Sequence, residues 1–277
     1  MTGCRNQSVT TKSGAWVPYV VPMAIYMAFL LAQSEWPKGL VWVYPVKTVA
    51  VAAALLGFRK KYEELRVPWS SAAAVGTGRN VLISYTLAVA VGLVAIVVWI
   101  GADPFYPGTT RLMGGKPPVP FDPTSIKPVA WQYAFIGFRV LGAVVVVAFM
   151  EEIFWRGFLI RWLDGKDFKR VPFGTCSWKS FLITVVLFGL EHEQWLAGVV
   201  CGALYNWLYC KRKDLFSYVL AHATSNAALA VWVLCGGGIG SFGEFAPKGR
   251  KCCVKRSFLE KWGDIQAFSN RRESLAV

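Results

Sequence analysis

The hydrophobic residues of this 277-residue chain are gathered in long blocks, and they do not alternate with polar residues or follow one helical stripe. A helix needs about 20 mostly apolar residues to cross the hydrocarbon core of a bilayer. Seven apolar blocks can be distinguished: 16–32, 40–58, 81–100, 129–163, 181–196, 197–209 and 216–234. The pattern predicts an all-α fold, a polytopic transmembrane helix bundle of about seven to eight spans.

Two of these assignments are less simple than the others. The fourth block is too long for one plain span, and it contains the charged residues Glu151, Glu152 and Arg156. The fifth and sixth blocks follow each other almost without a break. The sequence therefore leaves open where the helix that begins near residue 181 ends.

The composition supports a membrane protein. Hydrophobic residues make up 55% of the chain and charged residues only 17%, whereas soluble domains carry about 25% charged residues. The net charge of +14 comes from Lys and Arg in short clusters between the apolar blocks. This distribution is typical of topology signals in membrane proteins, and it argues against nucleic acid as a partner.

The basic clusters predict an orientation. The loops 59–79, 161–179 and 211–213 are rich in Lys and Arg, so we place them and the N-terminus in the cytoplasm. Seven spans would then leave the C-terminal tail outside, although it carries eight Lys and Arg between Lys248 and Arg272. Three explanations stay open: a miscounted span, re-entry of the Gly-rich stretch 236–243, or tail charge that does not set topology.

Cysteine usage and the N-terminus suggest neither a disulfide framework nor a removed leader. The seven cysteines are odd in number, and Cys201, Cys210 and Cys235 lie in or beside apolar blocks, where buried thiols are expected. The first apolar block lacks a small-residue cleavage pattern after it, so we expect it to be the first span.

Ionisable groups within the apolar blocks are the candidates for chemistry, because burying them in a bilayer costs free energy. Three groups stand out, at 151–156, 188–193 and 222–226. Four-residue spacing on a helix lets Glu152 pair with Arg156, which leaves Glu151 on another face as a free base.

The same spacing places His222 and Asn226 on one helical face. Counted from the cytoplasmic helix ends, Glu151 and His192 lie roughly 16 Å deep and His222 roughly 10 Å deep. We therefore predict that all three groups converge on one site in the cytoplasmic half of the membrane.

The three motifs, Glu-Glu-x-x-x-Arg, Phe-x-x-x-His and His-x-x-x-Asn in that order, resemble those of the CAAX prenyl protease and bacteriocin-processing family of intramembrane endopeptidases. The resemblance covers about 129–234. It implies that Glu151 and His192 activate a water, and that His222 and Asn226 stabilise the oxyanion. It also implies supporting positions for Glu152 and Arg156. Glu191 and Glu193 flank His192 outside the motif pattern, and two roles stay open for them, to line a polar entrance or to orient the imidazole.

The resemblance gives a complete functional expectation. It implies a peptidase that hydrolyses a peptide bond of a peptide or membrane-anchored protein substrate, without a cofactor, as a multi-pass integral protein of a bacterial-type inner membrane. Whether the substrate is prenylated stays open. We divide the chain into a polar segment 1–14, N-terminal transmembrane helices with an external loop 15–128, a catalytic core 129–235, and a Gly-rich, then basic tail 236–277.

Three alternatives remain. Glu151, His192 and His222 are a sufficient zinc ligand set for the same hydrolysis, although no His-Glu-x-x-His motif is present. The same charges would serve a proton-coupled transporter. Internal repeats would favour a transporter, and the chain does not evidently contain any. A non-catalytic immunity or scaffold protein would not need all three motifs.

Overall fold

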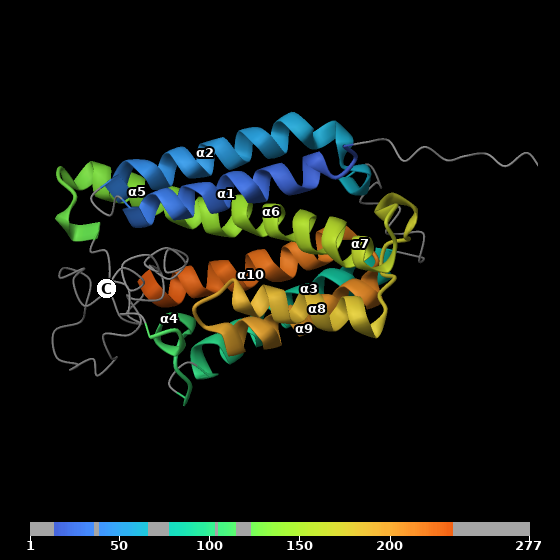
Figure 1. Ribbon diagram of the computed structural model, residues 1–277. Coiled ribbons are helices and arrows are strands. Elements are labelled where there is room, and N and C mark those ends of the chain that lie inside the picture. Colours follow the sequence, from blue (N-terminus) through green and yellow to red (C-terminus); the bar gives the residue numbers. More distant parts are fainter. Residues whose placement is uncertain (1–13, 36–38, 66–77, 103–104, 115–122, 235–277) are drawn as a thin grey trace, which may run out of the picture.

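The computed structural model describes residues 14–35, 39–65, 78–102, 105–114 and 123–234, and every regular element within them is helical (Figure 1). The predicted all-α fold is thus confirmed for this part of the chain. The polar segment before residue 14, the Gly-rich stretch 236–243 and the basic tail lie outside the described residues. The side on which the tail lies therefore stays a prediction.

The α-helices are α1 (Val17–Glu35), α2 (Leu40–Phe58), α3 (Gly78–Ala102), α4 (Thr109–Leu112), α5 (Val129–Leu141), α6 (Ala148–Glu152), α7 (Ile160–Asp164), α8 (Trp178–Leu190), α9 (Trp195–Arg212) and α10 (Leu215–Leu234). Short 3-10 turns occupy Arg59–Lys61, Glu63–Leu65, Pro123–Ser125 and Phe168–Arg170. Two π-helical segments, Gly142–Val147 and Ile153–Leu159, join α5, α6 and α7 into one continuous helix.

The described helices fit a membrane environment. Four are long and apolar enough to cross a bilayer: Val41–Lys61, Leu82–Ala102, Val129–Asp164 and Leu215–Leu234. The apolar helices α1 and α8 are shorter. Large apolar side chains on the outer faces are exposed, for example Val97 at 70%, as expected of surfaces that contact lipid.

In Figure 1, α1 and α2 run along the continuous helix α5–α7, while α3 and α9 lie beside α10 and α8 pairs with α9. Close contacts at glycines allow this packing. A Cβ atom on Gly198 would lie 2.9 Å from the Cα atom of Gly189, so α8 and α9 form a tight hairpin. A Cβ atom on Gly92 would lie 2.8 Å from that of Thr224, which brings α3 directly against α10.

The hairpin answers one question that the sequence left open, and it corrects one sequence prediction. The boundary between the fifth and sixth apolar blocks lies at the connection between α8 and α9. We predicted that His192 lies inside a membrane-spanning helix. It lies instead in this connection, outside any helix. The Phe-x-x-x-His motif has the spacing of one helical turn, but the helix stops at Leu190 and the chain turns back toward Trp195.

The described parts of the three basic segments, 59–65, 161–179 and 211–213, lie at one end of the bundle, where α7 ends and α8 begins (Figure 1). Lys169 Nζ lies 2.9 Å from Glu63 Oε1, which connects the first and second of these segments. A disulfide between Cys176 and Cys210 fixes the end of α9 to the chain before α8. The prediction of a free thiol at Cys210 was therefore wrong. Its partner Cys176 comes from a polar loop, and the pattern of apolar blocks did not relate the two positions. Cys201 is a buried free thiol, as expected.

Candidate active site

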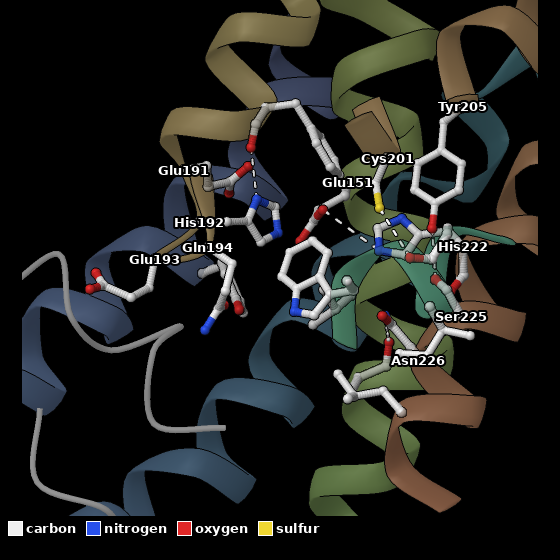
Figure 2. Close-up of a pocket in the computed structure, with 18 of the residues that line it drawn as sticks. Glu151, Glu191, His192, Glu193, Gln194, Cys201, Tyr205, His222, Ser225 and Asn226 are labelled. Atoms are coloured by element: carbon white, nitrogen blue, oxygen red, sulfur yellow. Dashed lines mark hydrogen bonds and ion pairs between the residues drawn. The ribbon is translucent and has the colours of Figure 1, made fainter. Parts of the chain in front are cut away.

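One cavity of about 110 Å³ contains side chains from all three motifs (Figure 2). Glu151 comes from α6, His192 from the connection between α8 and α9, and His222 and Asn226 from α10. A water needs at least about 10–15 Å³ of such space, so the cavity has room for a water together with part of a substrate. The structure thus brings the four residues together, as their order and depth suggested.

Measured along the helices, Glu151 and His192 lie slightly farther from the basic end of the bundle than the sequence estimate. The 13 residues of α8 extend over roughly 20 Å at about 1.5 Å per residue, and His192 follows the far end of that helix. Glu151 is separated from the basic end by a similar length of helix, from Ile153 to Asp164.

Glu152 and Arg156 form the predicted ion pair, with 3.1 Å between Glu152 Oε1 and Arg156 Nη1, and both side chains are almost completely buried. Arg156 also donates from Nε to Asn206 Oδ1 at 3.0 Å and from Nη2 to the carbonyl oxygen of Gly202 at 3.2 Å. Asn206 was missed in the sequence analysis. The sequence did offer a sign of its importance, because Asn206 is a polar residue in an apolar block, and a buried side-chain amide needs hydrogen-bond partners.

Glu152 does more than pair with Arg156. His222 Nδ1 lies 2.8 Å from Glu152 Oε1 and donates to it, and His222 Nε2 lies 3.9 Å from Glu151 Oε2. The imidazole also stacks on the ring of Tyr205, with 5.2 Å between ring centroids and 21° between the ring planes. His222 is therefore fixed in orientation, with one nitrogen toward each carboxylate.

His192 is oriented by a different set of contacts. Its Nδ1 donates to the carbonyl oxygen of Phe188 at 2.7 Å, because a carbonyl can only accept. The edge-to-face contact with Trp99 of α3 has 5.2 Å between ring centroids. When neutral, this imidazole carries its lone pair on Nε2.

Asn226 is held by the backbone of the first π-helical segment. Its Nδ2 donates to the carbonyl oxygen of Ala143 at 2.8 Å. A side-chain amide carries two N–H donors, so one of them is used in this contact and the second is left for another acceptor.

Two cations on the cavity wall were also missed. Lys47 of α2 lies with Nζ 4.5 Å from the centroid of the Tyr44 ring, and Arg139 of α5 lies with Cζ 5.2 Å from the same centroid. Both line the cavity. Each is an ionisable residue within an apolar block, so the rule that singled out the three motif groups applies equally to them.

The zinc alternative depends on how the possible ligands are arranged. Within the described residues, no group of three or more His, Cys, Asp or Glu side chains is arranged to hold a metal ion. The candidate set of Glu151, His192 and His222 lines the cavity without forming such a group. The metal-free reaction therefore stays a prediction, with the zinc-dependent reaction as its alternative.

Carboxylates, imidazoles and an amide that surround a small buried cavity are the groups that a hydrolase of the membrane interior requires. Comparison with known families agrees with this class. Residues 133–228 match the model of the family described as Rce1-like, type II CAAX prenyl endopeptidase Rce1-like. The resemblance to CAAX endopeptidases is thereby confirmed for this part of the chain, and it supports a general intramembrane peptidase activity.

The matched region contains all seven specified residues of the three motifs, and it excludes α1, α2, α3 and α4. Neither the curated proteins nor the solved structures include a match to the chain.

Proposed function

We propose that the protein is an intramembrane endopeptidase that hydrolyses a peptide bond with Glu151 and His192 as the water-activating groups and His222 and Asn226 as the oxyanion-stabilising groups. The observation that carries the proposal is the convergence of these four side chains on one cavity. They come from three separate stretches of chain, and the match to CAAX endopeptidases covers all of them.

Water activation requires a proton acceptor beside the attacking oxygen. Within the described residues, Glu151 Oε2 is a buried oxygen that accepts no hydrogen bond. Because His192 donates through Nδ1, its Nε2 is available as a second acceptor. In the proposed step a water adds to the carbonyl carbon and its proton passes to one of these groups. The same proton is then delivered to the leaving amide nitrogen as the C–N bond breaks.

Oxyanion stabilisation requires hydrogen-bond donors. His222 uses Nδ1 toward Glu152, so it donates from Nε2 only as the imidazolium. In that state the cationic His222 and Arg156 face the carboxyl groups of Glu151 and Glu152 within one buried network. The second N–H of Asn226 supplies another donor.

The cavity wall suggests one property of the substrate, which is expected to be a peptide or a membrane-anchored protein. Lys47 and Arg139 place two basic side chains on the wall formed by α2 and α5, and we expect a negatively charged substrate group to lie there. Lys47→Met should then raise KM roughly 10-fold for such a substrate, the size expected for a hydrogen bond to a charged group. An unchanged KM would argue against this placement.

The decisive experiment measures cleavage by purified protein in detergent or liposomes. Glu151→Gln, His192→Ala and His222→Ala should each lower kcat by about 10²- to 10⁴-fold, the range of acid–base and oxyanion contributions. Arg111→Gln, at an exposed residue of α4, is the control and should leave the rate unchanged. Cleavage at the parent rate by all three site variants would refute the assignment.

Two further measurements separate the alternatives. We expect activity to survive extensive chelation, with no metal found by elemental analysis. Loss of activity on chelation and its recovery with Zn²⁺ would favour the zinc version of the reaction. Ion flux through reconstituted vesicles that Glu151→Gln abolishes, without peptide cleavage, would favour the transporter.

A further inference from the structure

The chain after α3, residues 105–114, is fastened onto the connection between α8 and α9. Glu193 of that connection accepts from Thr109 Oγ1 at 2.7 Å and from Thr110 Oγ1 at 2.6 Å, both through Oε2. The backbone N–H of Thr110 donates to both carboxylate oxygens, at 2.9 and 3.1 Å. The backbone N–H of Thr109 donates to the carbonyl oxygen of Glu193 at 3.0 Å.

Neighbouring contacts extend this attachment to α9. The indole Nε1 of Trp195 donates to the carbonyl oxygen of Pro107 at 3.2 Å. The backbone N–H of Ala197 donates to the hydroxyl oxygen of Tyr106 at 3.1 Å. A Cβ atom on Gly108 would collide with the Glu193 side chain, so the two segments touch without space between them.

The connection held in this way is the one that carries His192. Glu193 is its immediate neighbour in the chain, and both residues line the cavity. His192 also contacts Trp99, which lies near the end of α3, just before the 105–114 segment. Thus α3 contacts the imidazole, while the segment that follows α3 holds the next residue along the chain.

We infer that Glu193 is a positioning residue for His192, acting through the α8–α9 connection and the 105–114 segment. The inference rests on the proposed function, because it assumes that His192 takes part in the reaction. A connection outside regular secondary structure needs external contacts to hold a side chain in place, and a carboxylate that accepts several N–H and O–H donors is a strong contact. Misplacement of a reacting group by 1 Å can lower a rate about 10²-fold.

The contacts of Glu193 distinguish this role from one in substrate binding. Both of its carboxylate oxygens accept hydrogen bonds from Thr109 or Thr110. The partners belong to a segment outside the region that matches the endopeptidase family. The 105–114 segment therefore helps to hold His192 in place, which the matched region does not do alone.

A double-mutant cycle tests the inference with the full-length protein and a cleaved peptide. Glu193→Ala should lower kcat roughly 10-fold or more, with KM changed less than about two-fold. Thr109→Val combined with Thr110→Val should give a smaller loss, because the backbone N–H of Thr110 still donates to the Glu193 carboxylate. Adding the two threonine changes to Glu193→Ala should lower kcat no further than Glu193→Ala alone, because the threonine hydroxyls act through that carboxylate. Glu193→Gln, which keeps one acceptor oxygen, should lie between the parent and Glu193→Ala.

Rates are expressed per folded molecule, so a variant that only lowers the folded fraction gives no change in kcat. If Glu193→Ala does not fold, the threonine pair and Glu193→Gln carry the test. Arg111→Gln in the same segment should behave like the parent.

An unchanged kcat in Glu193→Ala, or an increase in KM alone, would overturn the positioning role. If His192→Ala and Glu151→Gln retained the parent rate, the proposed function itself would fail. If those two variants are inactive while Glu193→Ala is fully active, only the positioning inference fails.

Discussion

The region that matches the endopeptidase family and the helices that precede it contribute differently to the site. Residues 133–228 supply all seven specified residues of the three motifs. The preceding helices supply walls and attachments, among them Lys47, Trp99 and the partners of Glu193. The comparison indicates that the reacting groups are concentrated in the matched region, whereas their placement depends on both regions.

Three ion pairs differ in whether they lie within the matched region or join it to the preceding part of the chain, and in how far they are buried. Glu152–Arg156 lies within the matched region, with side-chain exposures of 0% and 1%. Glu64–Arg161 joins the N-terminal part to the matched region and is also buried. Glu63–Lys169 joins the same two regions at the surface, where the Glu63 side chain is 60% exposed. Substitutions in these pairs should therefore have graded effects.

The largest effect is expected for Arg156→Met. It leaves Glu152 buried with one fewer cation and also removes the hydrogen bond to Asn206. Breaking a buried pair from one side costs about 3–5 kcal/mol, so the free energy of unfolding, measured by SDS titration in mixed micelles, should fall by that amount. Glu152→Gln together with Arg156→Met should recover part of the loss. A single variant as stable as the parent would contradict the central place of this pair.

A smaller effect is expected for Glu64→Gln. Arg161 keeps its hydrogen bonds to the carbonyl oxygens of Val171 and Gly157, and Tyr19 can still donate to the new amide oxygen. We expect a loss of about 1–3 kcal/mol in the same titration. Because the pair lies away from the cavity, kcat per folded molecule should stay at the parent value. A large fall in kcat would show that the two regions are coupled through this contact.

The smallest effect is expected for Lys169→Gln. Exposed ion pairs contribute about 0–1 kcal/mol and are screened by salt. The free energy of unfolding should therefore change by less than about 1 kcal/mol, and any difference should shrink at high ionic strength. A loss of stability as large as that of Glu64→Gln would mean that the contribution of an ion pair does not depend on its solvent exposure.

Much of the fold was predictable because hydrophobic blocks report helices directly. The blocks at 40–58 and 216–234 agree with α2 and α10 to within one residue at each end. The Glu152–Arg156 pair was predictable because it depends only on spacing along one helix. The meeting of Glu151, His192 and His222 in one cavity was anticipated from motif order and from depth along the helices.

What the sequence did not predict are contacts between distant segments. The hydrogen bonds of Glu193 reach 84 residues back to Thr109, and no local pattern relates these two positions. The bond between Glu152 and His222 spans 70 residues, so spacing revealed the partner of Glu152 on its own helix and not the one on α10. The end of α8 was hidden because the chain stays apolar on both sides of the connection.

The two π-helical segments, Gly142–Val147 and Ile153–Leu159, lie on either side of Glu151 and Glu152. Each one shifts the register between the residues before it and those after it, because its hydrogen bonds skip one more residue than those of an α-helix. The direction of Glu151 therefore depends on the number of residues in this helix as well as on their identity. A single-residue deletion before Ala148 would turn the carboxylate by about 100° around the helix axis. Insertions and deletions in this stretch should consequently be tolerated far less than substitutions of one apolar residue for another.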